Sequence, residues 1–199
     1  MGMRRRARER ALQFLYQNDL NPALNLEEAL GHFFESQRRA VTRDENSSDA
    51  APVVAAAAAS GTAATTAIAD APAPLPPLSA EAQADLAAAA LSEEITAQRF
   101  ADPLIRGVIR HLESLDAEIQ KYAHNWDVRR MAAVDRNVLR LAVYEMRHRD
   151  DIPPVVSINE AVEIAKRFST QESGKFVNGI LDRIRGDLMR NSRVGTSTP

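Results

Sequence analysis

The chain has 199 residues, of which 45% are hydrophobic, so it can bury the core of one or two small domains. It contains no cysteine, which excludes disulfides and thiolate chemistry, and no apolar run approaches the roughly 20 residues that span a bilayer. The formal net charge of -2 argues against nucleic-acid binding, but five of the first ten residues are arginine. Because no apolar core of a signal peptide follows these arginines, we expect a cytoplasmic protein with no membrane association.

The first predicted element is a helix over residues 4–20, with its apolar side chains packed inward and its arginines projecting outward. Positive charge at a helix N-terminus opposes the helix dipole by about 0.3 to 1 kcal/mol where it is exposed. A polyanionic partner for these arginines explains that arrangement better than the alternative, which is that they only solubilise the end of the helix.

A second helix is predicted over residues 25–37, packed against the first as an antiparallel pair. The next segment, 44–92, is rich in alanine and proline and has no aromatic or basic residue. It offers too little apolar surface to offset the entropy of ordering, so we predict a disordered linker, in which residues 80–92 can form a helix. A spacer role is favoured over a binding role.

Regular structure is predicted to resume at Asp102-Pro103, as an N-cap followed by proline at the first helical position, and to continue as one helix to residue 122. The segment 127–147 has apolar residues on most of its circumference, with Asp127 as its N-cap. We therefore predict that it is the central helix of the fold.

Two helices complete the predicted fold. Ser157-Ile158-Asn159-Glu160 has the capping-box pattern and is expected to start one of them, and Ser173 or Gly174 is expected to precede the last. No strand pattern is present. The sequence thus predicts an all-α protein of two small packed helical bundles, divided into an N-terminal basic arm and helical pair (1–43), the linker insert (44–92), a C-terminal bundle packed on the first helices (93–191) and a frayed tail (192–199).

Signals for catalysis are poor, because there is no glycine-rich phosphate loop and the four histidines lie far apart in sequence. We predict that the protein is not an enzyme and holds no metal or cofactor. A second candidate surface is the segment 172–179, where Lys175 could meet phosphate and an exposed Phe176 could stack on a base. The competing interpretation places Phe176 in the core.

Several motifs, in order, resemble the NusB family of bacterial transcription antitermination factors. They are Arg4-Arg5-Arg6-Ala7-Arg8-Glu9, Leu15-Tyr16, Val134-Asp135-Arg136, Leu139 to Glu145, Ile152-Pro153-Pro154, Ile158 to Lys166 and Gly174 to Asp182. The resemblance covers residues 3–40 and 100–186 and departs from the family at the insert.

The resemblance implies a function: binding of single-stranded, boxA-like RNA of ribosomal RNA leader transcripts, together with the ribosomal protein NusE, in an RNA polymerase antitermination complex that reads through terminators. By position it implies RNA contacts from Arg4, Arg5, Arg6, Arg8, Tyr16, Lys175 and Phe176, and contacts with the protein partner from Glu9, Asp135 and Glu172. A homodimer formed through the arginine helix, exclusive of RNA binding, is a further expectation.

Three alternatives remain open. A NusB-like RNA-binding domain of an rRNA methyltransferase is disfavoured because the sequence shows no cofactor-binding glycine loop. A helix-turn-helix DNA-binding protein is disfavoured because the C-terminal helices are too apolar for a recognition helix. The third alternative is a helical protein-interaction adaptor.

Overall fold

The structure is a computed structural model, and it describes residues 2–43, 79–124 and 126–194. Within these ranges all regular structure is helical, which confirms the predicted all-α class. The elements are α1 (Met3–Leu20), α2 (Leu26–Arg43), α3 (Ala80–Arg110), α4 (Leu112–Tyr122), the short 3-10 helix η1 (Val128–Arg130), α5 (Ala133–His148), α6 (Pro154–Phe168) and α7 (Gln171–Val194). Most of the predicted linker, residues 44–78, lies outside the described residues.

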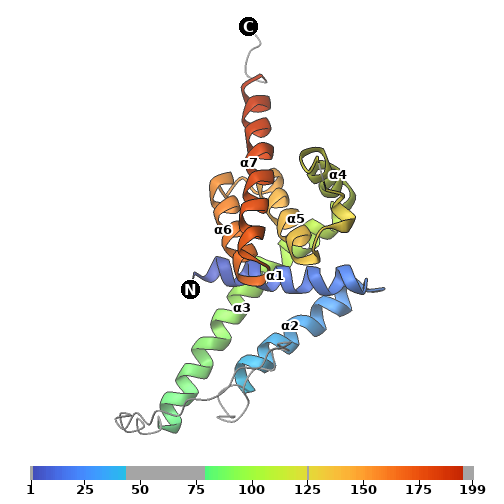
Figure 1. Ribbon diagram of the computed structural model, residues 1–199. Helices are drawn as coiled ribbons and strands as arrows, with labels where there is room; N and C mark the ends of the chain where they lie inside the picture. Colours follow the sequence, from blue (N-terminus) through green and yellow to red (C-terminus); the bar gives the residue numbers. More distant parts are fainter. Residues whose placement is uncertain (1, 44–78, 125, 195–199) are drawn as a thin grey trace, which may run out of the picture.

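Helix α1 lies across the middle of the molecule. The helices α5, α6 and α7 are on one side of it, and α2 and the first part of α3 are on the other (Figure 1). One continuous core joins the two sides, and the buried side chains Ala11 of α1, Leu104 of α3 and Leu139 of α5 all belong to it. The two helical bundles therefore meet at α1, which contributes to both.

The predicted central role of the segment 127–147 is confirmed in its helical part. Helix α5 contacts α1, α3, α4, α6 and α7, and Leu139 and Val143 are completely buried. The segment starts differently, because Asp127 caps η1 by accepting a hydrogen bond from the Arg129 amide at 2.9 Å. Helix α5 itself begins at Ala133.

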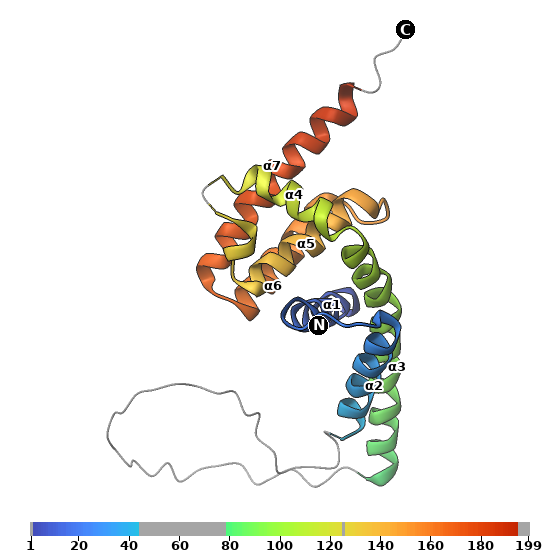
Figure 2. The same cartoon turned by 90° about the vertical axis from the view of Figure 1, so that its right-hand side faces the viewer.

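The predicted antiparallel pairing of the first two helices is wrong. Helix α2 extends to Arg43 and packs along the first part of α3, and α1 is seen end-on beside this pair (Figure 2). Contact between α1 and α2 includes the edge-to-face pair of Phe14 and Phe33, whose ring centroids are 5.4 Å apart. Hydrogen bonds from Arg38 of α2 to Gln98 of α3 at 2.6 Å and from Arg106 of α3 to Glu27 of α2 at 2.8 Å hold α2 along α3.

The start predicted at Asp102-Pro103 is also wrong, because Pro103 lies inside α3. The helix begins at Ala80, and Ser79 accepts a hydrogen bond from the Ala82 amide at 3.3 Å. The predicted domain boundary between 92 and 93 therefore falls within this helix. Proline removes one backbone hydrogen bond, but Ala97, Ala101 and Leu104 on the same helix are fully buried, and this tertiary packing stabilises the helix through the proline.

The helix predicted to run unbroken from 103 to 122 is interrupted at His111, between α3 and α4.

Helix α6 begins at Pro154, so the capping box predicted at Ser157 is wrong. Proline occupies the favoured first helical position, and the buried Ser157 hydroxyl donates to Glu145. Helix α7 begins at Gln171, before the predicted Ser173 or Gly174, and Thr170 Oγ1 accepts from the Ser173 amide at 3.1 Å.

Candidate nucleic-acid interface

Three of the N-terminal arginines of α1 pair with carboxylates from two other helices, α3 and α6. Arg5 donates two hydrogen bonds, of 2.9 and 2.8 Å, to Glu160 of α6. Arg6 donates to Glu93 of α3 at 3.1 Å, and Arg10 donates to Glu94 of α3 at 2.9 and 3.1 Å. These carboxylates balance the positive charge at the start of α1 and tie the helix to its neighbours.

Arg8 does not project outward as predicted. Its residue is only 3% exposed, and its Nε donates at 2.8 Å to Glu145 of α5, which is 1% exposed and also accepts from Ser157. Arg8 also lies over the Phe100 ring, 5.5 Å from the centroid. The structure thus places this predicted RNA contact in the interior, because Arg8 shares the buried face of α1 with Leu12 and Leu15.

Arg4, Arg5 and Arg6 remain at the surface. Arg4 is exposed and lies 5.7 Å from the centroid of the Phe100 ring. The side chains of Arg5 and Arg6 are 33% and 29% exposed despite their ion pairs. The Arg5 hydrogen bonds hold the pKa of the Glu160 carboxyl below its usual value, so both groups stay charged at neutral pH.

Tyr16 is exposed near the other end of α1, about 18 Å from Arg4 at 1.5 Å per residue along the helix. It borders an open groove of about 600 Å³ between α1 and α2, with Phe14, His32 and Phe33 in its lining. The predicted RNA contacts on α1 therefore span most of the length of the helix.

A second groove, of about 350 Å³, collects several of the other predicted site residues. Its lining includes Asp135, Glu172 and Phe176, together with Trp126 and Met131. The Trp126 and Phe176 rings meet edge to face with centroids 5.8 Å apart. Lys175 is exposed beside it and pairs with Glu172 at 3.0 Å. We call this the Trp126 groove.

Phe176 and Asp135 each make contacts within the protein and also leave a part available to a ligand in this groove. Phe176 is half-buried and packs on the core, so the core interpretation of the sequence holds for part of its ring. Asp135 is buried; its Oδ2 accepts from Ser173 Oγ at 3.0 Å, while its Oδ1 has no hydrogen-bond partner among the described residues. A buried carboxylate oxygen of this kind is available to a donor that enters the groove.

Trp126 was not among the site residues predicted from the sequence. The available signal was the single tryptophan of the chain in a short connection, where a large apolar side chain has little core to enter. Glu9, by contrast, was predicted to contact a partner, and the structure pairs it with Arg167 of α6 at 2.6 Å.

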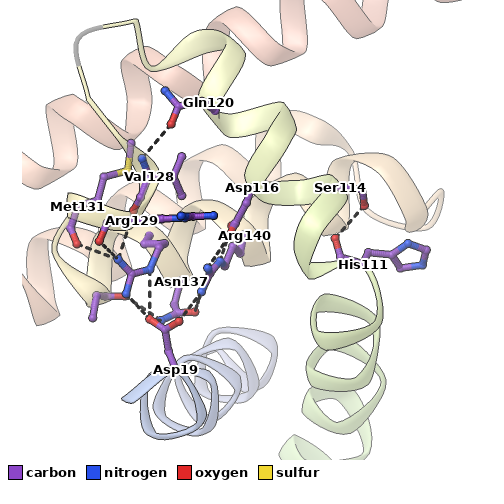
Figure 3. Close-up of polar contacts among 12 residues, drawn as sticks. Asp19, His111, Ser114, Asp116, Gln120, Val128, Arg129, Met131, Asn137 and Arg140 are labelled. Carbon is purple, nitrogen blue, oxygen red and sulfur yellow. Dashed lines mark hydrogen bonds and ion pairs between the residues drawn. The ribbon is translucent and has the colours of Figure 1, made fainter. Parts of the chain in front are cut away.

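A charged network connects the end of α1 to the wall of the Trp126 groove. Asp19 accepts hydrogen bonds from Arg136, from Asn137 at 3.3 Å and from Arg140 at 2.9 Å, and Arg140 also binds Asp116 (Figure 3). Burial alone would raise the pKa of Asp19, but the hydrogen bonds from the two arginines lower it below its usual value. The same Arg136 guanidinium donates to three main-chain carbonyls, those of Val128, Arg129 and Met131. The network therefore fixes the loop that carries one side of the groove.

Among the described residues, no cluster of histidine, aspartate or glutamate has the geometry of a metal site. His111 and His148 stack with their centroids 4.4 Å apart. No helix in the described part of the chain is long and apolar enough to cross a membrane.

The fold and these surfaces define the class of protein: an all-helical protein whose basic first helix is packed between a helical pair and a C-terminal bundle. The chain belongs to the NusB family, because the model of that family matches residues 75–185.

Similar proteins agree with this assignment. The transcription antitermination protein NusB of Thermodesulfovibrio yellowstonii is 56% identical over 85 residues, covering 43% of this chain and 56% of that protein. A solved structure of T. maritima NusB is 32% identical, with a TM-score of 0.55, and covers 91% of this chain and 89% of that one. The chain matches 56% and 42% of the length of the first two curated relatives, or about half.

A crystal structure of the antitermination factors NusB and NusE in complex with dsRNA supports the fold alone. It is 23% identical with a TM-score of 0.54, and covers 92% of this chain and 95% of that one.

Proposed function

We propose that this protein is an RNA-binding transcription antitermination factor. It binds single-stranded, boxA-like RNA of ribosomal RNA leader transcripts together with the ribosomal protein NusE, and so promotes read-through by RNA polymerase. The observation that carries the proposal is the row of three surface arginines, Arg4, Arg5 and Arg6, on the first helix of a member of the NusB family. The names of its relatives support the same activity. In this proposal the protein acts in the cytoplasm and performs no catalysis.

The ion pairs of these arginines are compatible with RNA binding. The pair of Arg6 with Glu93 is exposed, and such pairs contribute about 0 to 1 kcal/mol each, so a phosphate can replace the Glu93 carboxylate at little cost. Guanidinium groups bind phosphate with two hydrogen bonds, and each neutralised phosphate releases counterions. Arg8 has a different role in the proposal: it holds α1 against α5, and the surface arginines contact the RNA.

Tyr16 at the far end of α1, and Lys175 with the exposed part of Phe176, extend the proposed RNA path. Aromatic rings supply stacking surfaces for unpaired bases, at about 1 to 3 kcal/mol per base. In the Trp126 groove, the side formed by Trp126, the unsatisfied Asp135 oxygen and the nearby Glu172 is assigned to the protein partner, and Phe176 lies at the border with the RNA path. An apolar aromatic wall beside a buried acceptor suits an anchoring side chain that carries a hydrogen-bond donor.

The test is a gel-shift titration with boxA-like single-stranded RNA, with and without NusE, at two salt concentrations. Arg5→Ala combined with Arg6→Ala should weaken binding at least tenfold. The matched control is Arg39→Ala combined with Arg190→Ala, which removes the same charge from two exposed arginines elsewhere and should change binding much less.

The salt dependence identifies the contacts. For single strands the slope of log affinity against log salt falls by about 0.7 for each phosphate contact that is lost. Equal affinities of the Arg5/Arg6 variant and the control, or equal binding of duplex DNA by the wild-type protein, would overturn the proposal.

A further inference from the structure

A third groove lies beside the surface arginines, and of the residues that line it only Arg6 takes part in the contacts proposed so far. It has a volume of about 590 Å³, and its lining includes Arg6 and Arg10 of α1, Glu93 of α3, and Arg167 and Phe168 at the end of α6. We call it the α1–α6 groove. Its volume falls within the range of about 300 to 1,000 Å³ typical of small-molecule pockets, so it can admit one nucleotide.

Below the groove, Glu94 of α3 holds two of the arginines in place. Its side chain is 1% exposed, and it binds Arg10 through two hydrogen bonds and lies 3.3 Å from Arg6. A buried carboxylate held by arginines from another helix is fixed in position, because separating the charges leaves one of them unpaired in the interior. The two guanidinium groups are therefore oriented before any ligand arrives.

Glu93 binds Arg6 less firmly than Glu94 is held. Its side chain is 58% exposed, and it makes one hydrogen bond of 3.1 Å to Arg6. Such an exposed pair contributes little stability. A phosphate, which accepts two hydrogen bonds from the same guanidinium, can replace it. Arg6 thus has one fixed carboxylate partner below and one exchangeable partner at the surface.

Phe168 supplies the aromatic side of the groove. Its residue is 37% exposed, although it is a large apolar side chain at the end of a helix. The Arg167 guanidinium lies 5.1 Å from the centroid of its ring, and Arg167 is held by its ion pair with Glu9. An aromatic ring beside arginines is the arrangement in which a base stacks while its phosphate is bound.

We propose that the α1–α6 groove is a subsite for one nucleotide of the bound RNA strand, in which a phosphate replaces Glu93 on Arg6 and the base stacks on Phe168. The proposal rests on the proposed RNA-binding function and adds two residues to it: a stacking residue, Phe168, and an internal competitor, Glu93.

The test measures the affinity of the full chain for boxA-like RNA by fluorescence anisotropy. Glu93→Gln removes the competing charge and should raise the affinity roughly two- to fivefold more than Asp85→Asn, which makes the same charge change on an exposed residue of the same helix. This gain should disappear when Arg6→Ala is also present. An equal gain in the Arg6→Ala background, or equal effects of the two acidic variants, would overturn the proposal.

Phe168 is tested with two variants, one that removes the ring and one that keeps it, so that a folding defect is separated from a loss of stacking. Phe168→Leu should lower the affinity at least about fivefold, and Phe168→Tyr, which keeps the ring, should stay within about twofold of the wild type. Unchanged affinity of Phe168→Leu would contradict the stacking role. If the wild-type protein binds RNA but Phe168→Leu and Phe168→Tyr have equal affinities, the subsite is wrong and the RNA-binding function stands.

Two further outcomes count against the proposal. Absence of RNA binding by the wild type would reject the function and the subsite together. A change in sedimentation of the RNA-free protein in the Phe168→Leu variant, with no change in RNA affinity, would assign the groove to a second copy of the chain.

Discussion

Arg8 of α1 and Glu145 of α5 form an ion pair of 2.8 Å in which both side chains are almost completely buried. This pair joins the first helix, which carries the surface arginines, to the central helix of the C-terminal bundle. The Ser157 hydroxyl donates to the second oxygen of Glu145 at 2.8 Å and brings α6 into the same contact. The position of α1 therefore depends on residues at three separate places in the sequence.

Replacement of Arg8 should reduce stability strongly. Arg8→Ala leaves the Glu145 charge buried without its partner, which costs about 3 to 5 kcal/mol. Urea unfolding followed by circular dichroism measures this loss. Arg4→Ala serves as the control, because Arg4 is exposed and its removal should change the unfolding midpoint little. A variant Arg8→Ala with wild-type stability but weakened RNA binding would show that Arg8 contacts RNA directly.

The Asp19 network should make stability dependent on acid pH. Because the folded protein lowers the pKa of Asp19, the ion pairs contribute fully above the ordinary aspartate value of 3.8 and are lost as pH falls through the lower folded value. Asp19→Asn should therefore be less stable than the wild type at pH 7, and the difference should shrink below about pH 4. Urea unfolding of both proteins between pH 3 and pH 7 checks this. A difference that is constant with pH would argue against the network.

Gly107 should tolerate no side chain. A Cβ there would lie 1.9 Å from Tyr144 Cζ, so Gly107→Ala forces Tyr144 to move and should cost about 1 to 3 kcal/mol. The matched control is Gly179→Ala in α7, where a Cβ meets nothing within 4 Å, and which should be neutral or slightly stabilising. Thermal unfolding measures both. If the clash is the cause, adding Tyr144→Ala to Gly107→Ala should remove the extra cost.

Trp126 should matter for the protein partner more than for stability. The side chain is exposed and forms one wall of the groove that contains Asp135 and Phe176. Trp126→Ala should weaken binding of NusE about tenfold or more, as expected for an aromatic anchor. Calorimetric titration of NusE provides the measurement, with Met189→Ala, an exposed apolar residue of α7, as the control. Equal affinities of the two variants would place the partner elsewhere.

Periodicity was sufficient to predict α1, α5 and the all-helical class, because each of these helices has a wide apolar face. It failed where packing overrode a local signal. Asp102-Pro103 has the residues of a helix start, but burial of Ala97 and Ala101 carries α3 through the proline. Ser157 has the pattern of a cap, but Pro153-Pro154 starts the helix earlier, and Ser157 is used by Glu145.

The candidate site was predicted in part. The arginines of α1 were identified by composition, but composition cannot show that Arg8 is buried while Arg4 is exposed. The spacing of Arg8, Leu12 and Leu15 on one helical face was a usable signal that Arg8 is buried. Its partner Glu145 is 137 residues away in sequence, and such a pairing follows only from the tertiary structure.

The most direct test of the central claim is to map where the RNA lies on the protein. A boxA-like RNA carrying photoreactive 4-thiouridine would be crosslinked to the protein in the presence of NusE, and the crosslinked peptides would be identified by mass spectrometry. We predict crosslinks within α1, from Met3 to Tyr16, and near Lys175 and Phe176. Crosslinks confined to α2 or α4, with none on α1, would contradict the account.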